Sequence, residues 1–203
     1  MKKRLAAVLT LIAFAPASAE AHLVQSGMGP VYDGISHFGL SPEDFLPVIA
    51  LAFLAGLRGP LHARRTLAAV TVAWLAGGIV SLSGLTLPAI VLPSLTAALF
   101  LGIGGLLALN ADLAPTLCTA AATVLGLIRG AGDMAGVTAT PSHALALIGM
   151  TVSVFAVFAL AASVTLPLQR LWMIIAARVS GSWLAALGLL FAGWVLRYGA
   201  RVQ

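Results

Sequence analysis

The sequence predicts an all-α membrane protein, a single polytopic bundle of helices. Of its 203 residues, 61% are hydrophobic and only 8% are charged. Soluble domains carry about 25% charged residues, so a chain this apolar needs lipid to cover its surface. Most charges lie in short segments between apolar runs, as loops between transmembrane helices do. The net charge of +5 therefore indicates membrane topology and no nucleic-acid partner.

The first 21 residues are typical of a cleaved secretory signal peptide. Lys2, Lys3 and Arg4 precede an apolar core, and small residues follow it. Cleavage after Ala19 and cleavage after Ala21 both fit this pattern. An exported start places the mature N-terminus outside the cytoplasm, so we expect a multi-pass protein of the bacterial inner membrane.

We expect an extracytoplasmic glycine-rich segment over 22–41 and then a transmembrane helical domain over 42–203. About six spans should follow one another in that domain. They cover residues 43–57, 66–82, 88–109, 113–128, 142–163 and 181–196.

The segments between these spans have distinct compositions. Residues 58–65 carry three arginines and should form a cytoplasmic loop. Residues 129–140 are glycine-rich and should form an extracytoplasmic loop. Residues 166–180 fit either a cytoplasmic interfacial helix or part of a broken span.

The beginning of the first span is the most informative stretch. Ser41 is placed to cap the helix with its hydroxyl, and Pro42 suits the first helical position. Glu43 and Asp44 then lie in the first turn, where the helix dipole favours negative charge. The preceding residues are too broken for a span, and we expect Phe38 to anchor them at the membrane interface.

Ionisable residues close to spans are costly and are therefore functional candidates. The expected topology gathers several of them on the extracytoplasmic side, where they are candidate metal ligands. These residues are His37, Glu43, Asp44, Asp33 and Asp133, with His22 at the new N-terminus. His22 chelates a metal after either cleavage, or else belongs to a disordered tail. Cys118 is the only cysteine, which excludes an internal disulfide, and we expect it to be buried.

Two segments resemble the HupE/UreJ family. They are ISHFGLSPEDFLPVIALAFLAGLRG over 35–59 and GLIRGAGDMAG over 126–136. The resemblance implies a hydrogenase- or urease-associated membrane protein regarded as a nickel permease or accessory protein. His37 matches the first histidine of the family pattern, whereas Glu43 and Asp44 occupy the positions of its Asp-His pair. Arg129 replaces a histidine of the second motif, and Asp133 lies near the next.

These departures leave two interpretations open. His37 and the carboxylates retain a divalent-cation site, with Ni²⁺ or a similar ion as substrate and no firm cofactor. Alternatively, Arg129 pairs with Glu43 or Asp44, and a structural ion pair replaces the site, because a guanidinium has no lone pair for a metal.

The leading hypothesis for the function is a permease of a transition-metal ion, and the alternative is a membrane accessory or structural protein that binds a metalloenzyme or nickel-enzyme assembly factors. Few hydroxyls lie in the middles of the spans, which favours the accessory role. They are Ser81, Ser83, Thr119, Thr123, Thr151 and Ser153. The sequence has no nucleophile elbow, phosphate loop or HExxH motif, so we expect no enzyme.

Overall fold

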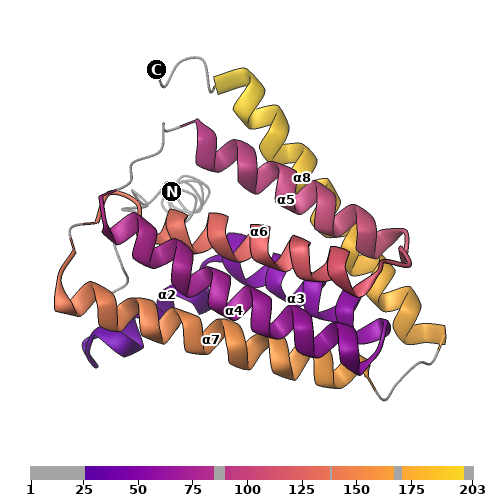
Figure 1. The fold of residues 1–203 in the computed structure, drawn as a ribbon. Helices are drawn as coiled ribbons and strands as arrows, with labels where there is room; N and C mark the ends of the chain where they lie inside the picture. The colour runs from indigo at the N-terminus through magenta and orange to yellow at the C-terminus, as the bar shows by residue number, and fades with distance from the viewer. Residues whose placement is uncertain (1–25, 85–89, 138, 167–170, 199–203) are drawn as a thin grey trace, which may run out of the picture.

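The computed structural model describes residues 26–84, 90–137, 139–166 and 171–198, which form seven helices and no strand (Figure 1). The helices are α2 (Pro30–Leu40), α3 (Pro42–Leu57), α4 (Pro60–Leu82), α5 (Val91–Ala108), α6 (Pro115–Asp133), α7 (Pro141–Thr165) and α8 (Leu171–Tyr198). The all-α prediction is therefore confirmed. The expected signal peptide and His22 lie outside the described residues.

Proline sets the beginning of five helices: Pro30, Pro42, Pro60, Pro115 and Pro141 each occupy a first-turn position. The missing N–H costs nothing there, and the fixed φ angle suits a helix. This explains why the expected loop over 58–65 is wrong. The chain turns between α3 and α4 with only two residues and is helical again from Pro60.

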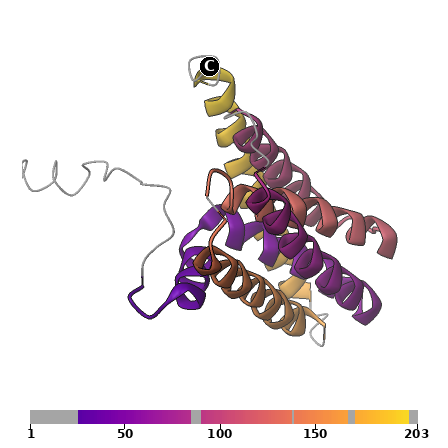
Figure 2. The ribbon, with the colours of Figure 1, turned by 60° about the vertical axis from the view of Figure 1, so that its left-hand side comes forward.

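Closely packed helix pairs build the bundle. Glycines on α6 let its backbone approach that of α4, since a Cβ on Gly126 or Gly130 would contact the α4 backbone at Val70 or Trp74. Small residues allow this close packing in membranes. Helices α5 and α8 form a second such pair, in which Gly181 faces Ala108. This pair diverges from the other helices toward the C-terminal end of α8 (Figures 1 and 2).

Four helices are long and apolar enough to cross a membrane: Pro60–Leu82, Val91–Ala108, Pro141–Thr165 and Leu171–Arg197. Helices α2 and α3 together make a fifth candidate, bent by 73° at their junction. Helix α6, which carries Arg129 and Asp133, is not among the candidates. The membrane character is clear, but the expected count of six spans is not confirmed.

Helices α6 and α8 extend beyond the expected boundaries. Helix α6 continues through Arg129 to Asp133, so the expected loop over 129–140 is wrong in its first five residues. Residues 171–180 are continuous with the last helix rather than a separate interfacial helix. Gly181 does not interrupt α8, because it lies in the contact with α5.

The expected glycine-rich segment over 22–41 differs most from its prediction, because its residues 30–40 form helix α2. Its glycine at position 34 packs against the backbone of Ala146 in α7, so from Pro30 onward the segment is helical and joined to the bundle. Phe38 is 1% exposed and is a core residue rather than an interfacial anchor. The thiol of Cys118 is buried, as predicted.

The turn between α5 and α6 is held by basic side chains from other helices. Arg58 donates to the carbonyl oxygens of Asn110 and Ala111, and Arg178 of α8 donates to that of Ala108 over 2.9 Å. His62, one turn into α4, lies 3.0 Å from the carbonyl oxygen of Leu113. The bond from Arg178 satisfies a carbonyl that the end of α5 leaves unpaired, and the other bonds hold the residues that connect α5 to α6.

Candidate metal centre

The junction of α2 and α3 brings a histidine and a carboxylate toward α6. The backbone N–H of Ser41 donates to the carbonyl oxygen of His37 over 3.0 Å and closes α2. Pro42 then starts α3 in a new direction. Ser41 is the N-cap by position, but its hydroxyl makes no capping bond, so that part of the prediction is wrong. The bend places His37 in the last turn of α2 and Asp44 in the first turn of α3.

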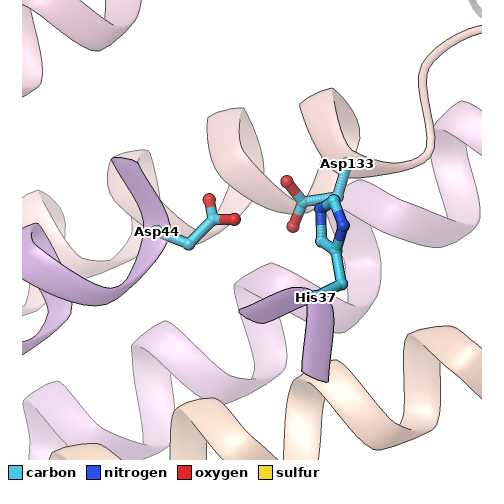
Figure 3. Close-up of side chains that lie close together, drawn as sticks. All are labelled: His37, Asp44 and Asp133. Carbon is cyan, nitrogen blue, oxygen red and sulfur yellow. The ribbon is translucent and has the colours of Figure 1, made fainter. Parts of the chain in front are cut away.

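His37, Asp44 and Asp133 form a cluster in which one donor atom from each residue lies within 4.8 Å of the other two. Figure 3 shows their side chains converging from α2, α3 and the end of α6. The Asp44 and Asp133 side chains are 0% and 2% exposed, and His37 is half-buried. We call this set the three-donor cluster.

Arg129 lies beside this cluster and bonds to both carboxylates. Its Nε and Nη2 atoms lie 2.6 Å and 2.5 Å from Asp44 Oδ1, and Nη2 lies 3.4 Å from Asp133 Oδ1. Its Nη1 donates to the hydroxyl of Thr96 on α5 over 3.1 Å. Arg129 thus ties α3, α5 and α6 together, and the expected Arg129–Asp44 pair is present.

The second oxygen of each carboxylate makes no bond to Arg129. Asp44 Oδ2 and Asp133 Oδ2 are buried and receive no hydrogen bond from a donor of the described residues, and the two carboxyl groups lie close enough to bond to each other through a shared proton. Buried polar atoms normally have a partner, because losing water without replacement is costly. Two such oxygens beside an imidazole are a donor set that suits a divalent cation.

The donors lie farther apart than in a loaded metal site. Zinc binds nitrogen and oxygen donors at about 2.0–2.2 Å in a tetrahedral arrangement, so neighbouring donors lie roughly 3.3–3.6 Å apart. The donor atoms of the three-donor cluster lie within 4.8 Å of one another, so binding an ion requires their side chains to move closer together. One imidazole with two carboxylates is a borderline set that accepts nickel, zinc, cobalt or manganese.

Phe38 and Phe45, which directly follow two of the donors in the chain, pack with Trp74 in an aromatic group. The Phe38 ring packs edge-on against Trp74, with centroids 5.7 Å apart, and against Phe45, with centroids 6.0 Å apart. Trp74 is 0% exposed. These rings exclude water, and in such surroundings charges interact more strongly than in solvent.

The other predicted ligands lie outside the cluster. Glu43 is half-buried in the first turn of α3 and is not one of the three donors. Its carboxylate lies close enough to interact electrostatically with all three donors and with Arg129. Asp33 accepts hydrogen bonds from the backbone N–H and the hydroxyl of Ser26, at 2.5 Å and 2.6 Å, and thereby closes the beginning of α2. His22 precedes the described residues.

Sequence reasoning missed Thr96 and the aromatic neighbours Phe38 and Trp74. Thr96 lies in an apolar span with no motif around it, so only the fold brings its hydroxyl to Arg129. The two aromatic residues have ordinary sequence contexts as well. To find them, one would have to know which faces of helices α2 and α4 point into the bundle.

A comparison with known proteins identifies the family of the chain. None of the curated proteins and none of the solved structures matches the chain significantly. A family profile described as HupE / UreJ protein matches residues 9–191. The match covers nearly the whole chain, including every residue of the three-donor cluster. The chain therefore belongs to the HupE/UreJ family of membrane proteins.

Proposed function

We propose that this protein handles a divalent transition-metal ion, most readily nickel, at the three-donor cluster, for the maturation of a metalloenzyme. The observation that carries the proposal is the pair of buried carboxylate oxygens of Asp44 and Asp133, which no donor of the described residues contacts, beside His37. Membership of a family of nickel permeases and accessory proteins supports the same role. It also favours transport or assembly over catalysis.

We infer the side of the membrane from the charge distribution. Arg58 lies between α3 and α4, and Arg64 and Arg65 lie near the beginning of α4. Basic residues near the ends of spans favour the cytoplasmic side. The three-donor cluster lies at the opposite ends of α3 and α6. We therefore assign the cluster to the extracytoplasmic half of the bundle, where it captures the ion before any transfer inward.

Whether the ion crosses the bundle depends on polar atoms inside it. Five of the six hydroxyls noted in the sequence, all but Ser81, bond to a carbonyl of their own helix. Helix α4 is different, because buried hydroxyls of Thr66, Thr71 and Ser81 have no partner among the described residues. These three hydroxyls support a permease with a route beside α4.

The alternative is an accessory protein that carries no ion. The Arg129–Asp44 bonds favour it, since a guanidinium already occupies one oxygen of Asp44. In that case the three-donor cluster is a structural ion pair, and the surface of the bundle binds an assembly factor. The two functions differ in whether purified protein binds nickel.

Calorimetric titration of the detergent-solubilised protein with Ni²⁺ tests the proposal. We expect saturable binding to one site, weakened roughly tenfold or more by His37→Gln or Asp133→Asn, because each change removes one of the three donors. Asp33→Asn is the matched control outside the cluster and should leave Kd unchanged. Equal affinity in all four proteins would refute the site.

Nickel uptake by whole cells then tests whether a protein that binds nickel also transports it. The permease predicts that Asp133→Asn reduces accumulation of radioactive nickel relative to Asp33→Asn at equal expression. Equal accumulation, together with cluster-dependent binding, would indicate a protein that binds nickel without transporting it.

A further inference from the structure

Arg129 is a buried cation inside a proposed cation site. Its side chain is 7% exposed, and all three terminal nitrogen positions face protein groups. The guanidinium stays charged at any pH that proteins tolerate and has no lone pair for a metal. Its position beside the ligands is therefore unfavourable for metal binding and calls for an explanation.

The two oxygens of each carboxylate have different surroundings. Oδ1 of Asp44 and Oδ1 of Asp133 face Arg129, whereas Oδ2 of both residues is buried and receives no hydrogen bond from a donor of the described residues. Arg129 thus orients both groups and partly neutralises them. Like charges close together repel, so without this cation two buried carboxylates would destabilise each other.

The same charge opposes an incoming ion. Asp44 Oδ1 contacts Arg129 directly, and Asp44 also belongs to the three-donor cluster. A divalent ion bound there lies next to a guanidinium among apolar residues, where repulsion is weakly screened. Part of the attraction of the carboxylates is therefore already used by Arg129.

We propose that Arg129 is a resident competitor of the metal ion: it holds the empty three-donor cluster in shape and lowers its affinity, so that a captured ion is released again. This inference rests on the proposed function. It makes Arg129 a residue that determines affinity and release rate, with no direct bond to the ion. Thr96 holds the guanidinium in place from α5.

Charge-changing variants separate competition from a purely structural role. Arg129→Gln removes the charge but keeps a hydrogen-bond donor, and its Ni²⁺ Kd should fall by about tenfold or more, with slower release. Arg129→Lys keeps the charge and should stay within roughly threefold of the wild type. Arg58→Gln is the matched control, since it makes the same change at the other end of α3, and its Kd should not change.

The outcomes distinguish this inference from the proposed function. If neither the wild type nor Arg129→Gln binds Ni²⁺, the metal site itself is refuted. If the wild type binds through His37 and Asp133 but Arg129→Gln binds equally well or more weakly, the site stands and competition is wrong. Arg129 is then a clamp between helices.

A second measurement needs no neutral variant and applies even if Arg129→Gln does not fold. Nitrogen-15 NMR of arginine-labelled protein follows the Arg129 Nε–H, assigned with Arg129→Lys, during titration with diamagnetic Zn²⁺. Competition predicts that exchange of this proton with water accelerates at least about tenfold, as the bond to Asp44 weakens. A proton that remains equally protected when zinc saturates the site would overturn the inference.

Discussion

Asp44 and Arg129 form the most strongly buried charged contact among the described residues, with side chains 0% and 7% exposed. Removing one partner of such a pair leaves a charge without water or counter-ion. The pair adds little compared with an apolar replacement, yet breaking it is expensive. The contribution of the pair to the free energy of unfolding can therefore be measured only by comparing variants of each partner alone with a variant of both.

We predict that Asp44→Ala lowers the free energy of unfolding by roughly 3–5 kcal/mol, because Arg129 loses its nearest carboxylate. Denaturant titration in detergent micelles measures this change. The double variant Asp44→Ala/Arg129→Met should recover part of the loss, since the remaining Asp133 carboxylate can be neutralised by a proton, whereas the guanidinium cannot lose its charge. A double variant no more stable than Asp44→Ala alone would contradict this account of the pair.

The sequence identified His37, Asp44 and Asp133 among a larger group of candidates, and only the fold separated them. Adjacent helical residues point about 100° apart. Glu43 and Asp44 therefore face different surroundings, but α3 is apolar on all sides and its sequence does not reveal which side faces inward. Asp33 was equally plausible as a ligand until its bonds to Ser26 were known.

At the scale of the elements, the contact between α4 and α6 positions the end of α6 that carries the cluster. Gly130 lies against the backbone of Trp74, where an added Cβ would collide with the carbonyl group. Asp133 follows less than one turn later. The position of this carboxylate thus depends on a glycine that makes no contact with an ion.

We predict that Gly130→Ala destabilises the protein by roughly 1–3 kcal/mol, because the α4 and α6 backbones must separate. It should also weaken Ni²⁺ binding by displacing Asp133. Gly102→Ala on α5 is the control, since a Cβ there meets nothing within 4 Å, and the change should stabilise by about 0.5–1 kcal/mol. Thermal unfolding and calorimetry on both variants check this, and equal effects of the two changes would contradict it.

Helix boundaries were the least predictable feature of the elements. Charged residues at 64, 65 and 129 suggested loops, but all three are helical, because proline fixes the beginning of α4 and the Arg129–Asp44 bonds hold the end of α6 in the bundle. Helix α2 was also missed, since its glycines indicated turns. Gly34 does not interrupt α2, and its lack of a side chain allows α2 to contact the backbone of α7.

For the whole molecule, hydrophobicity alone predicted the class. A chain with 61% hydrophobic residues and few charges has no alternative to a helical bundle in lipid. The number of spans was harder, because α6 combines an ordinary helix length with two charged residues, and α2 with α3 makes one bent unit. Both α6 and the bent α2–α3 unit contribute donors to the three-donor cluster. The elements that are hardest to classify as spans are therefore those that form the candidate site.

The cluster is also a property of the whole bundle, because Asp44 and Arg129 lie 85 residues apart in the chain. Its composition gives it a spectroscopic signature. His37 is the only imidazole in the three-donor cluster, and the remaining ligands are oxygens. A site at the mature N-terminus would instead involve His22 and amide nitrogens.

X-ray absorption spectroscopy of nickel-loaded protein in detergent tests the metal site most directly. We predict a nickel shell of nitrogen and oxygen atoms that includes one imidazole, whose multiple-scattering signal disappears in His37→Gln and persists in His22→Gln. A spectrum that loses its imidazole only in His22→Gln, or that is identical in both variants, would contradict metal binding by His37, Asp44 and Asp133.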